Sequence, residues 1–483
     1  MKLVPALIAS LTAGLVLAGS ASAVDVGVVD DYGIAPENAP WFLDSLADLG
    51  MRENRLSIPW DPEAPTTIHR QLALEQYVPL ATLRGVRVVF AVSPTKAKAI
   101  TSEPGAAAKY VDFLQHLART FPGVKDYVIG NEPNQPRFWQ PQFGRRGEPL
   151  APAAYYSLLA GSYDALKAVD PSITVIGLGL SPRGNDQPRA RENVSISPVR
   201  FISGLGRAYR RAQRTKPIMD ELGFHPYPDR DTDSLTKGYR WPNAGVPNLD
   251  RIKQAFWDAF HGTRQPTFGE GRTRGSVTFR LDELGWQVGV VPGSAGAYHG
   301  RESVRTTSEA SQSAIYNQAI RYLACDASVR SILFFLLRDE PDLERWQAGL
   351  VRADGSRRPS FDSVKDIVAK TGGRCQGRMR SWRHSTKVAG ARVRFPKKRV
   401  LPARRLTLAV VLNAEEDATV QAGLYRGKRR VLRRRSTVKA YRSRIVRFST
   451  RFRPGRYTFR VTLRAAMNPA RKKRFSAGLQ ITR

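Results

Sequence analysis

Residues 86–130 carry the pattern that decides the fold of this chain. Residues 86–92 read VRVVFAV, residues 106–120 read AAAKYVDFLQHLART, and residues 127–130 read YVIG. The first and last runs are short and almost wholly apolar, which is typical of parallel strands buried on both faces. The middle run is amphipathic at helical spacing. The segment therefore predicts a strand, a helix and a second strand.

The same unit recurs along the chain from residue 24 to residue 374. Short apolar runs occupy residues 26–29, 55–59, 86–92, 127–130, 173–178, 222–225, 277–281 and 332–337. Helical patterns between them include residues 106–120, 153–169, 199–214 and 308–324. Eight strand–helix units in about 350 residues fit one α/β domain, a (β/α)₈ TIM barrel. The loops after its strands are expected to build a site at one face.

The pattern changes after residue 375. Residues 456–464 read RYTFRVTLR and alternate strictly between apolar and polar side chains. Similar runs occupy residues 388–395, 406–412, 419–426, 443–448 and 476–482. Alternation with turns about every ten residues predicts a small all-β sandwich, immunoglobulin- or fibronectin-like, over residues 376–483.

Most of the net charge of +35 belongs to this C-terminal part. Residues 376–483 hold 32 Lys and Arg against three acids, whereas residues 1–375 hold 45 basic and 39 acidic residues. Such a surface can bind an anionic cell-wall polymer, nucleic acid or an acidic membrane. The alternative is a soluble accessory module from an organism that uses arginine freely. Specific nucleic-acid recognition is not expected, because no aromatic residues are interleaved for base stacking.

The N-terminus resembles an export signal. Lys2 precedes an apolar run over residues 3–18, and Ala21-Ser-Ala23 supplies small residues for cleavage. Residues 1–23 are therefore predicted to be a secretory signal peptide, with an uncleaved membrane anchor as the alternative. No later stretch is apolar enough to span a membrane, so we expect a secreted, extracellular protein.

The cysteines and histidines point away from a metal site. An exported chain with two cysteines, Cys325 and Cys375, is expected to form a disulfide. The six histidines are scattered, without the close pairs typical of zinc sites. We therefore expect neither a metal nor a cofactor in the chemistry.

Two glutamates follow predicted strands at positions suited to catalysis. Glu132 lies in YVIGNEPN (127–134) after the fourth strand, and Glu283 lies in FRLDELGW (279–286) at the end of the seventh. Both are expected at the mouth of the barrel. Cleaving a glycosidic bond with retention needs two carboxyl groups about 5–5.5 Å apart, one protonated and one ionised. Either glutamate alone is as readily read as a solvated rim residue, but the pair predicts a catalytic centre.

These motifs resemble glycoside hydrolase clan A, which includes the family 5 cellulases and mannanases and the family 39 xylosidases and iduronidases. The resemblance covers nearly all of residues 24–374. It implies that Glu132 is the acid/base and Glu283 the nucleophile. It also implies that Asn131 binds the sugar 2-hydroxyl and that Tyr227, in His225-Pro-Tyr227 after the sixth strand, donates to the nucleophile.

Other residues are assigned by the same resemblance or by their chemistry. Arg55, on the second strand, is expected to brace the nucleophile, or alternatively to pair with another buried acid such as Glu53. His225 is expected in the site, with a packed histidine as the alternative. The aromatic residues Trp60, Trp139 and Trp286 are candidates for stacking on sugar rings, and a core or rim role is the alternative.

The sequence departs from the clan after the eighth strand. Clan members often present a Trp there as a sugar platform, but residues 336–341 read LLRDEP and Trp346 comes later. Asp339 and Glu340 are expected to bind substrate or anchor the loop. Taken together, the sequence predicts a retaining glycosidase that hydrolyses β-linked O-glycosidic bonds in a poly- or oligosaccharide. The alternatives are a non-catalytic glycan-binding barrel and a surface-binding protein that acts through its basic module.

Overall fold

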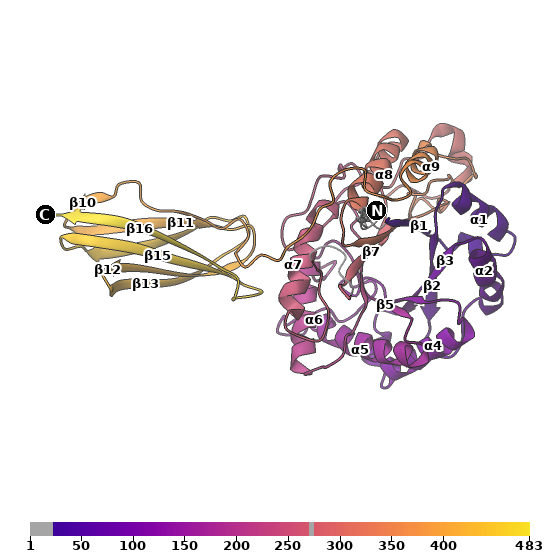
Figure 1. Ribbon diagram of the computed structural model, residues 1–483, viewed down its shortest axis with the longest axis horizontal. Coiled ribbons are helices and arrows are strands. Elements are labelled where there is room, and N and C mark those ends of the chain that lie inside the picture. The colour runs from indigo at the N-terminus through magenta and orange to yellow at the C-terminus, as the bar shows by residue number, and fades with distance from the viewer. Residues whose placement is uncertain (1–22, 270–274) are drawn as a thin grey trace, which may run out of the picture.

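A computed structural model describes residues 23–269 and 275–483 (Figure 1). The predicted signal peptide lies outside the described residues, apart from Ala23. A ring of strands and helices is followed by a separate β-sheet module, whose strands extend away from the ring (Figure 1). Among the described residues, no helix has the length and apolar character needed to cross a bilayer.

Eight parallel strands close into a barrel, with β1 pairing to both β2 and β8. The strands are β1 (Asp25–Val29), β2 (Glu53–Trp60), β3 (Arg87–Pro94), β4 (Asp126–Ile129), β5 (Thr174–Leu180), β6 (Glu221–Phe224), β7 (Thr278–Leu284) and β8 (Val329–Phe334). Each predicted strand overlaps an observed one. The predicted (β/α)₈ fold is therefore confirmed.

Helices surround the barrel and cover the outer face of its strands (Figure 1). They are α1 (Ala39–Asp48), α2 (Gln71–Leu83), α3 (Ala99–Ser102), α4 (Ala106–Thr120), α5 (Ala151–Val169), α6 (Pro198–Arg211), α7 (Leu249–Phe260), α8 (Glu309–Ala324) and α9 (Pro359–Thr371). Three 3₁₀ turns lie in loops: η1 (Tyr32–Ile34), η2 (Val246–Asn248) and η3 (Pro292–Ala297). The alternating side chains of a strand divide between helices and barrel interior: Phe90 packs outward in the main core, and its neighbours Val89 and Ala91 lie in a separate interior cluster.

The barrel interior also holds a charged layer near the start of its strands, called here the lower layer. At its centre is Arg280 of β7, which is 1% exposed. Its guanidinium donates to Glu53 at 2.9 Å, to Asp126 at 2.8 Å and to Glu221 at 2.9 Å. These three acids begin β2, β4 and β6, so one arginine of β7 joins three other strands at this end of the barrel.

Two sheets form the C-terminal module, which confirms the predicted all-β architecture. One has the order β10-β16-β15-β12-β13 and the other β14-β11-β9. The strands are β9 (Arg392–Arg394), β10 (Val400–Pro402), β11 (Arg405–Asn413), β12 (Ala418–Arg426), β13 (Arg429–Val438), β14 (Arg444–Arg451), β15 (Gly455–Ala465) and β16 (Lys472–Thr482). Their inward apolar side chains form a core of their own. Strands β10 and β13 were not predicted. The sequence of β13, RRVLRRRSTV, shows no regular alternation of apolar and polar residues.

The module meets the barrel beside α7 through a buried ion-pair network. Arg471 donates to Asp258 of α7 at 2.9 Å and to Glu416 at 2.7 and 3.0 Å. Burial raises the pKa of Glu416, and the charge of Arg471 opposes that rise. Asp417 of the module also contacts Arg200 of α6. Two of the three acids of the module, Glu416 and Asp417, therefore lie where the module meets the barrel.

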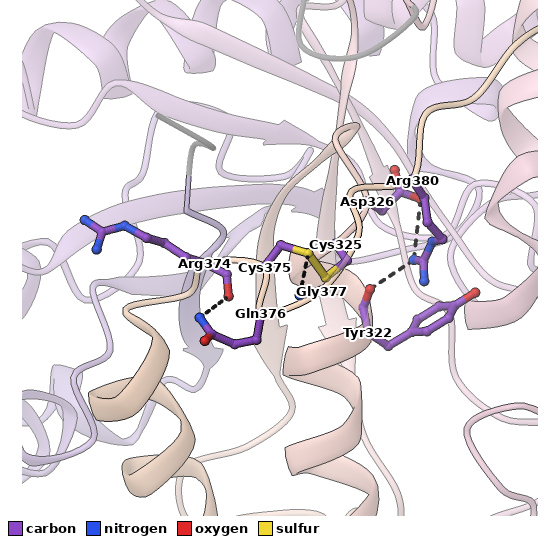
Figure 2. The surroundings of a disulfide bond; sticks show 8 residues. All are labelled: Tyr322, Cys325, Asp326, Arg374, Cys375, Gln376, Gly377 and Arg380. Atoms are coloured by element: carbon purple, nitrogen blue, oxygen red, sulfur yellow. Dashed lines mark hydrogen bonds and ion pairs between the residues drawn. A yellow bond between two sulfur atoms is a disulfide. The ribbon is translucent and has the colours of Figure 1, made fainter. Parts of the chain in front are cut away.

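The structure joins Cys325 and Cys375 in a disulfide (Figure 2). Cys325 directly follows α8, and Cys375 lies after α9, with the two Cα atoms 4.6 Å apart. The backbone N–H of Arg380 donates to the carbonyl of Cys325 at 2.7 Å, and the Arg380 guanidinium packs over the Tyr322 ring. The segment that leaves the barrel is therefore fixed to the end of α8 before it enters the module.

Candidate active site

The two predicted catalytic glutamates face one cavity of about 630 Å³ at the open end of the barrel. Glu132 comes three residues after β4, and Glu283 lies at the end of β7. Their side chains are 14% and 12% exposed, so both are largely enclosed but reachable from the cavity. Arg55, Asn131 and Tyr227 line the same cavity.

The separation of the carboxylates decides which reaction they suit. One carboxylate oxygen of Glu132, one of Glu283 and a ring nitrogen of His225 all lie within 4.8 Å of one another. Retaining glycosidases place their two carboxyl groups about 5–5.5 Å apart, whereas inverting enzymes need about 6.5–9.5 Å to admit a water. The geometry suits direct attack by one carboxylate.

Glu283 accepts hydrogen bonds from two side chains of the cavity wall. Arg55 donates to its Oε1 at 2.7 Å, and the Tyr227 hydroxyl donates to its Oε2 at 3.0 Å. Burial disfavours the charge on Arg55, but the carboxylates of Glu283 and Asp282 outweigh it and raise the pKa of Arg55. A carboxylate that accepts charged and phenolic donors is stabilised as an anion.

Glu132 has a different set of partners. Its carboxylate oxygen is 3.0 Å from Nδ1 of His225, and neither Arg55 nor Tyr227 bonds to it. Its backbone has a φ of 37°, in the left-handed region that side chains other than glycine rarely adopt. The backbone N–H of Glu132 donates to the carbonyl of Gly179 at 3.0 Å, which ties this turn to β5. Such strain costs about 1–3 kcal/mol and concentrates at functional sites.

The His225 ring lies close to the carboxylates of both glutamates. It is fully buried, and although burial favours the neutral ring, the charges of Glu283 and Asp282 raise its pKa to about 10. Its Nδ1 also lies 3.4 Å from Oε2 of Glu283, and its Nε2 lies 3.5 Å from Oδ1 of Asp282. The ring is therefore an imidazolium that donates to Glu132.

Asp282 completes this group and was not predicted from the sequence. It is fully buried, and although desolvation opposes its charge, His225 and Arg55 lower its pKa. Its Oδ2 lies 3.7 Å from Nε of Arg55. The sequence did contain an indication of this position. Asp282 is two residues from the inward-facing Arg280, so both side chains face the barrel interior, and a buried acid there requires cationic partners.

A glycine makes room for this carboxylate. A Cβ on Gly223 of β6 would lie 3.1 Å from Oδ1 of Asp282 and 2.9 Å from the backbone nitrogen of Gly179. Both contacts are closer than real Cβ atoms comfortably allow. Strands β5 and β6 therefore approach closely here, and any larger residue would push Asp282 away from His225.

Trp346, which follows the eighth strand at a distance in sequence, lines the cavity. Its ring centroid lies 5.0 Å from that of Tyr227 and 5.7 Å from that of Phe335, and all three residues line the cavity. Indole rings of this kind stack well on sugars. The position directly after β8 has no Trp, as the sequence indicated, but the loop that follows brings Trp346 to the cavity.

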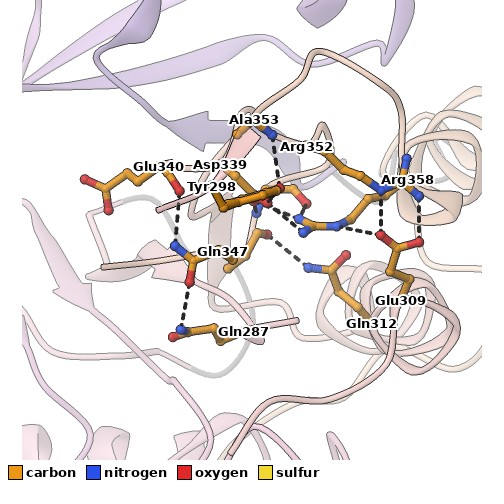
Figure 3. Close-up of polar contacts among 12 residues, drawn as sticks. Gln287, Tyr298, Glu309, Gln312, Asp339, Glu340, Gln347, Arg352, Ala353 and Arg358 are labelled. Atoms are coloured by element: carbon orange, nitrogen blue, oxygen red, sulfur yellow. Dashed lines mark hydrogen bonds and ion pairs between the residues drawn. The ribbon is translucent and has the colours of Figure 1, made fainter. Parts of the chain in front are cut away.

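A polar network fixes the course of that loop (Figure 3). Arg358 donates to both carboxylate oxygens of Asp339, at 2.7 and 2.6 Å, and Tyr298 donates to the same carboxylate at 2.6 Å. In the same loop, the side-chain amide of Gln347 donates to the backbone carbonyl of Glu340 at 3.1 Å. Asp339 therefore anchors the loop, whereas Glu340 lines the cavity.

Three tryptophans predicted to bind substrate lie in the core instead. Trp60, Trp139 and Trp286 are at most 2% exposed, and none of them lines the cavity. Trp60 packs edge-on against Tyr110, Trp139 against Tyr155, and Trp286 against Tyr316. Their prediction as sugar-binding residues is wrong, because each is buried among outward strand residues and the surrounding helices.

Three side chains of the types that ligate metals, Glu132, His225 and Glu283, lie close together in the cavity wall. A metal requires a neutral imidazole nitrogen. The His225 pKa of about 10 leaves both ring nitrogens protonated at neutral pH. Arg55 and Tyr227 already donate to Glu283. The donor set therefore suits proton transfer and anion stabilisation better than metal ligation.

No protein-family model and no curated protein matches the chain. Among solved structures, a glucosidase from Croceicoccus marinus aligns with a TM-score of 0.48 and 12% identity over 88% of this chain and 93% of its own. An endo-1,4-β-mannanase from Rhizomucor miehei gives 0.45 and 12% over 72% and 96%.

The chain spans 45% of the length of a calcium-binding mutant of Bacteroides uniformis β-glucuronidase 2, with 95% of this chain aligned, a TM-score of 0.42 and 11% identity. All three TM-scores lie below 0.5. The chemistry assigned below therefore depends on the geometry of the site alone.

Proposed function

We propose that this chain is a retaining glycoside hydrolase that acts on β-linked O-glycosidic bonds of an oligo- or polysaccharide. The observation that carries the proposal is the pair of carboxylates within 4.8 Å whose partners differ. Glu283 accepts from Arg55 and Tyr227, whereas the Glu132 carboxylate accepts, among the described residues, only from His225. Two carboxyl groups in unequal surroundings are what an acid and a nucleophile require.

The first step follows from these contacts. Glu132 protonates the departing glycosidic oxygen while ionised Glu283 attacks the anomeric carbon and forms a glycosyl-enzyme. Arg55 holds the attacking carboxylate and also donates to Oδ1 of Asn131 at 3.0 Å. Because that oxygen is occupied, the amide nitrogen of Asn131 is left to donate to the sugar 2-hydroxyl as positive charge develops on the ring.

The second step reverses the proton transfer. Glu132, now a carboxylate, takes a proton from water, which attacks the glycosyl-enzyme and releases the sugar with its configuration retained. His225 donates to Glu132 throughout and stabilises the anion that forms when the acid has given up its proton. Trp346 provides a face on which a sugar ring can stack beside the reacting centre.

The test is a screen of aryl β-glycosides and of plant and microbial polysaccharides, followed by proton NMR of the first product anomer. The proposal expects turnover with a β product and its loss in Glu283→Gln. Glu344→Gln is the matched control, because Glu344 is an exposed residue that lines the same cavity and is not bonded to the pair. An α product from a β substrate, or full activity of Glu283→Gln, would contradict the mechanism. Glycan binding without turnover would instead favour a non-catalytic barrel.

We also propose that the protein acts outside the cell, on the strength of the signal-like residues 1–23. Fractionation of the native host, followed by N-terminal sequencing of the exported form, tests this directly. A mature chain that begins at Val24 is expected. A chain that stays in the cytoplasm with Met1 intact would refute it.

A further inference from the structure

The five-stranded sheet of the C-terminal module has a hollow on its outer face. Ser476 of β16, Arg460 of β15, Gly423 of β12 and Arg433 of β13 are paired in register across four strands. Residues paired in this way present their side chains on the same face. Gly423 has no side chain and the Tyr425 ring packs over it, and a cavity of about 450 Å³ is lined by this row and its neighbours.

Three arginines surround this hollow. Arg433, Arg460 and Arg474 all line it, together with Tyr425. Adjacent strands lie about 4.8 Å apart, so the backbones of Arg433 and Arg460 are separated by about 10 Å across Gly423. The two side chains leave the same face of the sheet on either side of Gly423, which the Tyr425 ring covers.

The hollow carries no balancing negative charge. The three acids of the module are Glu415, Glu416 and Asp417, and none of them lines the hollow. In the part of the chain that the structure describes, no ion pair is formed by any of the three arginines around it. The Nε of Arg433 is also buried there without an acceptor.

Tyr425 fixes one of the arginines and narrows the kind of ligand. The Arg460 guanidinium lies 4.6 Å from the centre of the Tyr425 ring. A Cβ on Gly423 would be 2.7 Å from that ring, so the glycine lets the tyrosine lie flat under the arginine. One face of the ring is thus covered by Arg460 and cannot serve as a stacking platform for a nucleobase. A preoriented guanidinium binds carboxylates in bidentate fashion.

We propose that this arginine hollow is a second carbohydrate-binding site, which binds the carboxylate groups of an acidic, uronic-acid-containing polysaccharide. The choice of a polysaccharide rests on the function proposed for the barrel. Binding at the hollow would hold the barrel close to its polymer and raise the local concentration of glycosidic bonds. Charge attraction would contribute part of the affinity, and the fixed guanidinium groups the rest.

The experiment measures binding of the full-length chain carrying Glu283→Gln to polygalacturonate by titration calorimetry in low and moderate salt. Arg433→Gln/Arg460→Gln/Arg474→Gln is expected to weaken binding at least tenfold. The matched control is Arg405→Gln/Arg447→Gln/Arg451→Gln, which removes the same charge from exposed positions on the other sheet and should change affinity less than threefold. Replacing Arg433 and Arg460 by lysine keeps the charge, and should recover only part of the affinity.

Several outcomes would overturn the proposal. Equal losses in the hollow and control variants would mean that net charge alone attracts the polymer. Full affinity of the lysine variant would exclude guanidinium recognition, and tighter binding to duplex DNA or to anionic vesicles would assign the surface to another partner. Turnover of small aryl β-glycosides, which need no polymer binding, tests the barrel separately.

Discussion

The barrel contains two charged layers, one at each end of its interior. The lower layer is Arg280 with the acids Glu53, Asp126 and Glu221. The upper layer surrounds Arg55 and His225 and contains Asp282 together with Glu132 and Glu283. Both are built from carboxylates on several strands that converge on cations.

The two layers differ in access to solvent and in the symmetry of their contacts. In the lower layer, Arg280 is 1% exposed and reaches all three acids. In the upper layer, Asp282 is sealed but the two glutamates open onto a cavity and have unequal donors. Where one arginine bonds all of its acids alike, such a cluster only fixes the strands. Opened on one side, it can hold one carboxylate ionised and leave another to exchange protons.

The same substitution made in each layer gives the sharpest test of this contrast. Glu132→Gln should lower kcat by about 100- to 10,000-fold while leaving the melting temperature nearly unchanged, because it removes a general acid. Glu221→Gln should leave kcat nearly unchanged but lower the melting temperature, because it removes an ionic partner of Arg280. Steady-state kinetics and thermal denaturation of both variants measure the difference. If Glu221→Gln lost as much activity as Glu132→Gln, the two layers would not be separable.

A larger change in the lower layer probes its structural role. Arg280→Met leaves three buried carboxylates without their common cation. Breaking a buried ion pair on one side costs about 3–5 kcal/mol. Chemical denaturation should show a loss of this size, or the variant should fail to fold at 37 °C. The triple variant Arg280→Met/Glu53→Gln/Asp126→Asn should recover part of that stability. If it recovers none, the stability lost in Arg280→Met is not caused by unpaired charge.

Much of this contrast could be predicted from sequence. The apolar runs in the sequence predicted all eight strands. Because Glu132 and Glu283 come at the ends of two of these runs, both were predicted at the mouth of the barrel. The contacts of Arg55 and Tyr227 with Glu283 also match what the family resemblance implied. These features depend on strand order and on which residue ends each strand, and both can be read along the chain.

Features that depend on burial or on loop paths could not be read in this way. Trp60 and Trp286 follow or end strands as catalytic residues do, but their rings turn outward into the core. The loop that brings Trp346 to the cavity is held by Asp339 and Arg358, a contact between residues 19 positions apart. In β13, arginines replace the apolar alternation that marks a strand.

A smaller effect in the upper layer should follow from Tyr227→Phe. The variant loses one hydrogen bond to the nucleophile, and a bond to a charged group contributes about 1.5–3 kcal/mol. We expect kcat/KM to fall by about 10- to 100-fold with little change in fold. Tyr298→Phe is the matched control, since that hydroxyl donates to Asp339 in the loop anchor instead. Equal losses in the two variants would show that loop placement, not contact with Glu283, governs the rate.

The mildest change is Asp282→Asn, and its signature is a shift along the pH axis. His225 has a pKa of about 10 in the folded protein, which its carboxylate neighbours hold above the ordinary value near 6.5. Its charge therefore stabilises the native state fully below about pH 6.5, and that contribution is lost as pH rises through the folded value. Without the Asp282 charge the His225 pKa should fall, and the alkaline limb of the melting-temperature profile should move down by about one pH unit.

At neutral pH the same variant should lose less than about tenfold in kcat, because Glu283 still faces the imidazolium. A merely structural role for Asp282 predicts something different: a lower melting temperature at every pH with the alkaline limb in its original place. Parallel pH profiles of kcat and of melting temperature therefore separate the two roles. Since Asp282 never faces the cavity, a displaced limb would show that the sealed part of the upper layer sets the protonation of its open part.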